Sequence, residues 1–348
     1  MLKWRRGEQK ALELVAPNHK EFLTPMIEIV PLPYDFVNEV PAKSIDGHLE
    51  KIGEQIECAW GKAPVFLDLD QIDDTEAMKN GTHPLGFALS ECRVRRLHVI
   101  PVTGWDRDDS YNDEVVNANR VDNFGVCFRM VDEDFVDLDN RLKSLLSSLG
   151  ISPEGVDLVL DFKHVGDEKT TVIALISIIN SIPFLDQWRT LTFVGSSFPE
   201  NLSAVSANTI GIVPRIEWSI WELINSKSGT IKRIPSFGDY AIAHPSYVEI
   251  DPRLMQMSAS IRYSARDVYL LVKGVSVRKL SWSQTKDQCK KIVALPEYSG
   301  ASFSWGDEYI MNCSKGTAST GNAETWRRVG TNHHLSLAAS QISSFVAP

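Results

Sequence analysis

The chain has 348 residues, of which 43% are hydrophobic and 23% charged, a composition that excludes a disordered, collagen-like or coiled-coil protein. No apolar stretch approaches the ~20 residues of a transmembrane helix, and no apolar run of a secretion signal follows the basic N-terminus. The five cysteines are widely spaced and include no CxxC pair. We therefore expect a reduced, cytoplasmic protein without membrane association, disulfide framework or cysteine-rich zinc site.

The charge is unevenly distributed along the sequence. The formal net charge is −9, but residues 251–348 hold 12 Lys and Arg against 7 Asp and Glu, a net of +5 that leaves −14 for the first 250. Acidic stretches lie at 68–76, 106–114 and 132–139. General nucleic-acid binding is not favoured, because it would need a basic face. The C-terminal hundred residues leave room for a small basic patch only.

Eight short runs rich in Val, Ile, Leu and Phe indicate strands buried on both faces, as in parallel sheets. They lie at residues 23–30, 64–69, 97–102, 124–130, 156–162, 190–194, 211–216 and 234–240. Helical patterns separate several of them, at 45–60, 135–149, 170–182 and 218–224. Eight strand–helix units in about 240 residues predict an α/β fold of the (β/α)8, TIM-like barrel type. A doubly wound open sheet is the alternative, although neither GxGxxG nor GxxxxGK[ST] occurs.

The last hundred residues break this rhythm. They suggest strands at 260–263 and 268–273 and helices at 284–294 and 323–343. We interpret residues 1–250 as the barrel and 251–348 as a C-terminal α+β extension packed on it, within the same unit. The boundary is placed in the proline-containing stretch 244–252.

Polar residues cluster where the predicted strands end, and carboxyl-terminal strand ends form the active-site mouth of barrel enzymes. They are Glu28, Asp68, Asp70, Thr103, Arg129, Asp161, Lys163, Ser196, Ser197, Arg215, Glu217 and Asp239. Each also has a structural interpretation, because Asp70 could cap a helix and the oppositely charged residues could form ion pairs. Convergence of so many such residues predicts a pocket for a polar ligand.

Two kinds of chemistry fit these residues. Glu28, Asp68 and Asp161 come from three strands and could hold Mg²⁺ or another hard divalent ion. Asp161, Lys163 and Glu217 are the candidate catalytic residues of a metal-dependent phosphodiesterase or nuclease. Without a metal, the same groups could perform acid–base chemistry on a sugar.

Three arginines are the candidates for binding the phosphate oxygens of a ligand, because guanidinium groups make bidentate contacts. They are Arg129, Arg215 and Arg262.

Asp68 and Asp161 both follow apolar strand runs, so their carboxylates should emerge from a buried layer and need a cation or hydrogen-bond donors. The partner could be a metal or the counter-cation of an anionic ligand. It could also be Lys163, Arg129 or Arg215 in a structural network. We expect the first for Asp161, so that Asp161→Asn would abolish activity and leave stability almost unchanged.

Other motifs are weaker. His333 and His334 are adjacent, which on a helix separates their side chains by about 100° and disfavours a shared metal. We expect one of them in the core and the other exposed. Ser196 and Ser197 lack the GxSxG elbow of a hydrolase. Trp305 and Trp326 are expected in the core, with stacking on a ligand as the alternative.

The order of the motifs over nearly the whole chain resembles the phage-type "beta protein" family. The matching residues are Lys3, Gly7-Glu8, Ala11-Leu12, Pro25–Glu28, Pro31, Asp68, Pro101-Val102, Gly125, Arg129, Leu160-Asp161, Ser196–Pro199, Arg215–Trp218, Trp221, Phe237–Tyr240, Ile261–Tyr263, Gly274, Phe303–Asp307, Gly321-Asn322, Trp326-Arg327 and Asn332–Leu335. The resemblance implies one continuous unit. It also implies a setting among the accessory genes of phages and mobile elements, near anti-phage defence genes. It implies no reaction.

Three functions follow from these observations together. The first is a component of an anti-phage defence or phage–host conflict system that binds a phosphate-bearing ligand, or a companion protein from a neighbouring gene, at the barrel mouth. The second is the metal-dependent phosphodiesterase or nuclease. The third is a non-catalytic immunity protein that neutralises a companion toxin through its acidic surface, because acidic surfaces steer basic partners.

Overall fold

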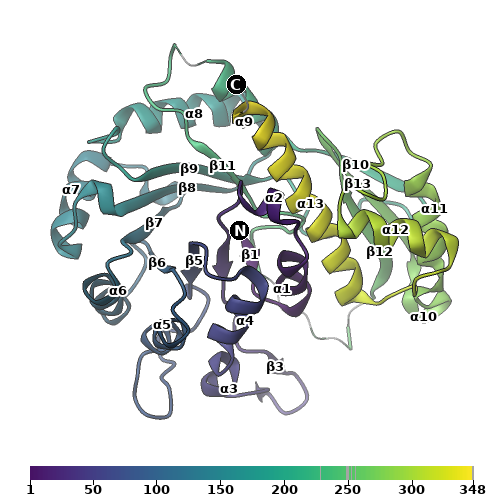
Figure 1. Cartoon of the computed structure of the whole chain (residues 1–348), viewed down its shortest axis with the longest axis horizontal. Coiled ribbons are helices and arrows are strands. Elements are labelled where there is room, and N and C mark those ends of the chain that lie inside the picture. The colour runs from purple at the N-terminus through teal and green to yellow at the C-terminus, as the bar shows by residue number, and fades with distance from the viewer. Residues whose placement is uncertain (228, 248–250, 252, 255, 347–348) are drawn as a thin grey trace. The chain divides into compact units, whose positions relative to one another are not determined.

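The computed structural model describes the chain except residues 228, 248–250, 252, 255 and 347–348. It divides into two compact units, each built from separate stretches of sequence (Figure 1). The first unit comprises residues 1–4, 24–196 and 216–240, and the second comprises residues 5–23, 197–215 and 241–348. The predicted boundary stretch 244–252 lies partly outside the described residues.

The first unit is a mixed α/β structure around one parallel sheet of eight strands. In spatial order the strands are β1 (Leu2–Lys3), β2 (Met26–Glu28), β5 (Val65–Asp68), β6 (Val99–Thr103), β7 (Val126–Met130), β8 (Val156–His164), β9 (Thr190–Ser196) and β11 (Ser236–Asp239). Most of these strands are buried along their length, as their continuous apolar runs predict. A separate hairpin, β3 (Tyr34–Asp35) with β4 (Val40–Pro41), follows β2.

The sheet is curled, and helices follow one another around its outer side (Figure 1). The helices of this unit are α3 (Ile45–Leu49), α4 (Ile52–Trp60), α5 (Pro84–Val94), α6 (Asp109–Asp122), α7 (Leu138–Leu149), α8 (Glu168–Ser181) and α9 (Ile216–Ser226). One interior cluster contains Met26 on β2, Tyr240 just beyond β11, and Val102, Val159 and Val194. The curl therefore brings residues from near the two opposite edges of the sheet together.

The predicted α/β fold with eight parallel strands is confirmed, but the prediction that these strands close into a (β/α)8 barrel is wrong. Among the residues that the structure describes, no strand pairing joins β1 to β11, and the curled sheet forms a half-barrel. The nitrogen of Met1 donates a hydrogen bond to the carbonyl of Asp239, but no ladder closes the sheet there.

One predicted strand of the barrel belongs elsewhere. The run at 211–216 forms β10 (Ile210–Pro214), which pairs antiparallel with β13 in the second unit, and the eighth parallel strand is the short β1. Ile212 on β10 is 67% exposed, so this strand is not buried on both faces as a central parallel strand would be.

The second unit is built on the antiparallel sheet β10–β13–β12, with β12 at Ser258–Ser264 and β13 at Val268–Ser276. Its helices are α1 (Arg6–Glu13), α2 (Pro17–Lys20), α10 (Val277–Leu280), α11 (Thr285–Val293), α12 (Trp305–Lys315) and α13 (Ala323–Val346). α13 packs against α1, α12 and β12. Trp326 is buried in the core of this unit, and Trp305 is half-buried against Tyr309, so both tryptophans pack.

A buried polar network holds the core of the second unit together. Asp307 accepts hydrogen bonds from the Tyr263 hydroxyl at 2.8 Å and the Ser304 hydroxyl at 2.6 Å. His333 contacts Asp307 through Nδ1 at 2.8 Å and the Ser264 carbonyl through Nε2 at 2.7 Å. Both ring nitrogens of His333 therefore have a buried oxygen partner.

The expectation that one of the two adjacent histidines is exposed is therefore wrong. His333 and His334 are both fully buried, and His334 Nδ1 pairs with the Ser264 hydroxyl at 2.7 Å. Polar partners in the core satisfy both rings, which lets both enter the interior.

None of the helices in the described residues is both long and apolar enough to span a bilayer.

Candidate functional site

The register of the first unit places two carboxylates side by side at the ends of neighbouring strands. Glu28 on β2 and Asp68 on β5 are paired positions in the ladder, and both are buried. Like charges directly opposite each other in a sheet are unfavourable, so this pair requires a cation.

Arg129 on β7 supplies that cation. Its Nη1 donates to Glu28 Oε1 at 3.0 Å and to Asp68 Oδ2 at 2.9 Å. Its Nε and Nη2 donate to Asp161 Oδ2 at 2.9 and 2.7 Å, and Nη2 also donates to the Tyr240 hydroxyl at 2.9 Å. These five bonds use all five N–H groups of a guanidinium. We call Glu28, Asp68, Arg129, Asp161 and Tyr240 the Arg129 cluster.

The pKa directions in the cluster follow from burial opposed by charge. Burial raises the pKa of Glu28, and Asp68 and Asp161 add to this, while Arg129 opposes it. Burial would also raise the pKa of Asp68, but Arg107 and Arg129 outweigh it and hold that pKa below its ordinary value. Glu28 Oε2 is buried without a hydrogen-bond partner. Of these two paired carboxyl groups, Glu28 thus takes up a proton more readily than Asp68.

Tyr240 is the member of the cluster that follows β11, the strand at the other edge of the sheet. Its hydroxyl donates a short hydrogen bond to Asp161 Oδ2 and accepts one from Arg129. Burial and then the charge of Asp161 raise the pKa of Tyr240 well above its ordinary value, so the hydroxyl keeps its proton.

A second buried cation, Arg107, extends the cluster toward the surface. Its Nη2 contacts Asp68 Oδ1 at 3.2 Å, and its Nη1 contacts Asp70 at 2.6 Å and also Asp106. Arg107 and Arg129 together face five carboxylates, so the strand ends of this unit present a surplus of negative charge.

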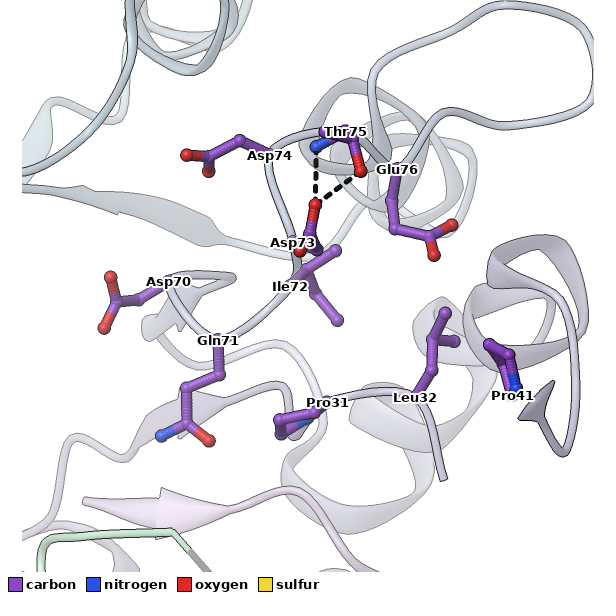
Figure 2. A pocket seen from close by; sticks show the side chains of 10 residues that line it. All are labelled: Pro31, Leu32, Pro41, Asp70, Gln71, Ile72, Asp73, Asp74, Thr75 and Glu76. Carbon is purple, nitrogen blue, oxygen red and sulfur yellow. Dashed lines mark hydrogen bonds between the residues drawn. The ribbon is translucent and has the colours of Figure 1, made fainter. Parts of the chain in front are cut away.

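A pocket of about 570 Å³ adjoins Arg107 through Asp70. Its lining comes from the segments that follow β2 and β5, together with the end of β4. The lining residues are Pro31, Leu32, Pro41, Asp70, Gln71, Ile72, Asp73, Asp74, Thr75 and Glu76 (Figure 2). The pocket therefore lies at the same strand ends as the Arg129 cluster.

The polar lining of this pocket consists largely of hydrogen-bond acceptors. Asp73 is already engaged, because its carboxylate accepts from the backbone and side chain of Thr75 (Figure 2). The carboxylates of Asp74 and Glu76 have no hydrogen-bond or ion-pair partner among the described residues, and Gln71 Oε1 is buried without one. The pocket is suited to a ligand that donates hydrogen bonds and carries positive charge.

The structure brings four of the predicted site residues into direct contact: Glu28, Asp68, Arg129 and Asp161. Lys163 lies two residues beyond Asp161, with an exposed side chain and a left-handed backbone at φ 50°, and its N–H donates to Asp161 Oδ1 at 2.9 Å. Glu217 is buried at the start of α9 beside Gly195.

The other two predicted arginines belong to the second unit. Arg215 Nη1 donates to the carbonyls of Ala265 and Arg266 and to Gln341 Oε1. Arg262 donates to the Ile242 carbonyl and lies over the Phe198 ring. The burial that surrounds Arg262 lowers its pKa to about 9. Of the three candidate phosphate-binding arginines, Arg129 thus belongs to the first unit and Arg215 and Arg262 belong to the second.

Arg129 and Tyr240 both contact the Asp161 carboxylate, which is the geometry of the structural-network alternative. Within the described residues, no three His, Cys, Asp or Glu side chains are placed to hold a metal ion. The Mg²⁺ site predicted from Glu28, Asp68 and Asp161 gains no support from this arrangement.

Sequence reasoning missed Arg107 and Tyr240. Arg107 lies in a loop within the acidic stretch 106–114, where neither strand nor helix periodicity marks it. The signal that could have found it is a lone arginine within an acidic run directly after a buried strand. Tyr240 ends a motif that carries the family resemblance, but its polar tip could not be placed without the curl of the sheet.

The buried carboxyl of Glu28 gives a pH prediction. Because its folded pKa is raised, Glu28 contributes stability as the pH falls through that pKa toward the ordinary carboxyl value. Glu28→Gln should be at least as stable as the parent at neutral pH, since Gln is neutral and still accepts from Arg129. The parent should gain stability relative to the variant as the pH falls through the folded pKa. Thermal melting from neutral pH to about pH 4.5, the ordinary Glu value, measures this.

The control for this prediction is Asp167→Asn, which should show the opposite sign. Asp167 caps α8 by accepting from Thr170 N–H at 2.7 Å, and hydrogen bonds to Thr170 lower its pKa. This variant should be less stable than the parent at neutral pH. The difference should disappear as the pH falls through the folded pKa of Asp167. A Glu28→Gln difference curve of the same sign as the Asp167→Asn curve would contradict the prediction.

Comparison with known proteins agrees with the resemblance seen in the sequence. No curated protein and no solved structure matches the chain. The family described as Beta protein matches residues 1–340, nearly the whole chain and both units. The chain therefore belongs to the Beta protein family.

Proposed function

We propose that the chain is a binding protein whose first unit receives a basic side chain, Lys or Arg, of a partner protein in the pocket beside Asp70. The observation that carries this proposal is the acceptor-rich lining of the pocket, in which Asp74 and Glu76 have no cationic partner among the described residues. Ligands of open α/β sheets bind outside the carboxyl ends of the strands, where this pocket lies.

Charge supports a cationic ligand. The segments of the first unit hold 19 Lys and Arg against 33 Asp and Glu, a net of −14, which would steer a basic partner toward it. Arg107 provides an internal example, because its guanidinium contacts Asp70 at 2.6 Å at the edge of the same pocket. Hydrogen bonds between such charged groups are about twice as strong as neutral ones.

The apolar part of the site favours a protein side chain over a free ion. Leu32 and Ile72 line the pocket and can contact the methylene stem of Lys or Arg. The β3–β4 hairpin, whose Pro41 also lines the pocket, exposes Val37 by 71% and Val40 by 50%. A partner that inserts a basic residue could cover these side chains with apolar neighbours of that residue.

The setting that we propose is conflict between phage and host, as the family resemblance implies, with the partner encoded nearby. An immunity protein that neutralises a basic toxin fits the acidic pocket best among the functions considered. A phosphate-bearing ligand has less support, because the N–H groups of Arg129 are all engaged by protein acceptors.

The experiment is a titration of the isotope-labelled full chain, followed by NMR of the backbone amides. The probes are N-acetyl-arginine methylamide and its uncharged counterpart, N-acetyl-citrulline methylamide. We expect the arginine probe, but not the citrulline probe, to shift signals of Gln71 to Glu76 and of Leu32. Asp74→Asn with Glu76→Gln should abolish the shifts, whereas the matched surface pair Asp113→Asn with Asp186→Asn should retain them.

The other functions give different results in the same titration. Inorganic phosphate that shifts signals around Arg129 and Lys163 would favour the phosphate-bearing ligand. Mg²⁺ that shifts signals around Asp68 and Asp161 would favour the metal-dependent enzyme. Equal shifts with arginine and citrulline probes, or none at the pocket, would overturn the proposal.

A further inference from the structure

The second unit carries a concentration of cations on α10, α11 and the end of α12. They are Arg278, Lys279, Lys286, Lys290, Lys291 and Lys315, which we call the α10–α12 basic face. Five of the six side chains are exposed, and Lys286 is half-buried. Asp287 is the carboxylate within this face, and Lys290 holds it at 2.8 Å. The nearest others in sequence are Glu297, beyond α11, and Glu308, at the opposite end of α12.

The cations of this face are close together in the fold. α10 continues through a 3₁₀ turn at Trp282–Gln284 into α11, and α11 packs against α12 (Figure 1). Lys286 and Lys290 are four residues apart and therefore neighbours on α11. A Cβ added to Gly316 would lie 2.6 Å from Lys286 Nζ, so Lys286 reaches the C-terminal end of α12 next to Lys315.

The negative net charge of the whole chain does not reveal that the second unit is positively charged. The segments of the second unit hold 17 Lys and Arg against 12 Asp and Glu, a net of +5 within a chain of −9. At physiological salt the Debye length is about 8 Å, so a surface partner senses the local charge and not the total.

The composition of the face decides between classes of anionic partner. Protein interfaces are depleted in Lys and have an aromatic or apolar centre. Here five of the six cations are Lys, and Leu280 is the large hydrophobic residue exposed on these elements. Contacts with a phosphodiester backbone need only dispersed cations, which bind by displacing condensed counterions. From this composition we infer that the α10–α12 basic face binds the backbone of a nucleic acid without reading its sequence.

The test measures fluorescence anisotropy with the full chain and three labelled probes: a short DNA duplex, its single strand and the RNA of the same sequence. We expect binding to at least one probe. The logarithm of its binding constant should fall linearly with the logarithm of the salt concentration. Lys279→Glu with Lys290→Glu should lower the affinity by about 10-fold or more and reduce the salt slope by about 2, since each lost phosphate contact removes about 0.9. The three probes distinguish DNA from RNA as the source of the phosphates.

The matched control is Lys51→Glu with Lys62→Glu, two exposed residues of the first unit that change the net charge equally. It should bind as the parent does. The milder pair Lys279→Gln with Lys290→Gln should give an intermediate loss, and near-UV circular dichroism checks that each variant folds. Equal losses in both reversed pairs, or no salt-dependent binding, would overturn the inference. Competition by poly-glutamate at the same charge concentration would also overturn it, in favour of an acidic protein. The inference is independent of the pocket in the first unit.

Discussion

Replacing Arg129 with Met should lower the free energy of unfolding by about 3–5 kcal/mol, the usual cost of removing one partner from a buried charge pair. The variant leaves Glu28, Asp68 and Asp161 buried without the guanidinium that contacts all three. Denaturant unfolding at neutral pH measures the loss. The deficit should shrink as the pH falls, because protonation of the carboxyls removes the charge that Arg129 had compensated.

The control is Arg93→Met, which breaks the surface pair with Asp122 at 2.6 Å and should cost no more than about 1 kcal/mol. Asp161→Asn belongs to the same test, because its partner is now known to be Arg129. It should destabilise by about 3–5 kcal/mol. A stable Asp161→Asn variant, or an Arg129→Met deficit that does not change with pH, would show that the cluster does not hold the fold together.

In the second unit, Asp307→Asn should also lower the free energy of unfolding by about 3–5 kcal/mol. The carboxylate contacts the Tyr263 and Ser304 hydroxyls and Nδ1 of the buried His333 ring, and Asp307 itself is fully buried. Asn replaces one of the two acceptor oxygens by an NH2 group, which leaves at least one of these partners without its acceptor. Denaturant unfolding of the full chain measures the effect.

Asp287→Asn is the matched control, since Asp287 pairs with Lys290 at a fully exposed site and the change should leave the free energy of unfolding almost unchanged. Tyr263→Phe should give an intermediate loss of about 1.5–3 kcal/mol, because it removes the hydrogen bond to the same carboxylate and the one that the hydroxyl accepts from Ser299 N–H. Equal effects of Asp307→Asn and Asp287→Asn would contradict the role of Asp307 as the centre of the buried network.

Strand and helix patterns predicted much of the first unit, because buried positions of strands and helices are occupied by apolar residues at regular spacing. The apolar run before Asp161 became β8, and the helical pattern at 135–149 became α7, which ends before Gly150 in a left-handed conformation. The strand-end rule identified Glu28, Asp68, Arg129 and Asp161, which do meet. Residues at strand ends of one parallel sheet are near one another whether or not the sheet closes.

The rest depended on long-range pairing that local patterns do not encode. β1 is two residues long, too short to leave a periodic signal, yet it is the eighth strand of the sheet, at the edge beside β2. In the place expected for the run at 211–216, β9 pairs directly with β11. The partner of that run, β13, lies more than fifty residues further along the chain. Sequence alone also left the partner of Asp161 open between a metal, a ligand's counter-cation and a nearby Lys or Arg, because a carboxylate that needs a cation does not reveal which cation it has.

Because the second unit is built from separate stretches of sequence, its parts leave the ribosome at different times. α1 packs against α13, and Arg327 pairs with Glu8 across 319 positions of sequence. At ribosomal rates of about 5–20 residues per second, α1 would emerge roughly 15 to 60 s before its partner. During that interval Ala11 and Leu12, buried in the finished protein, have no α13 to cover them. The middle of the chain can meanwhile fold, so the opening helix is a natural point for a chaperone to hold the nascent protein.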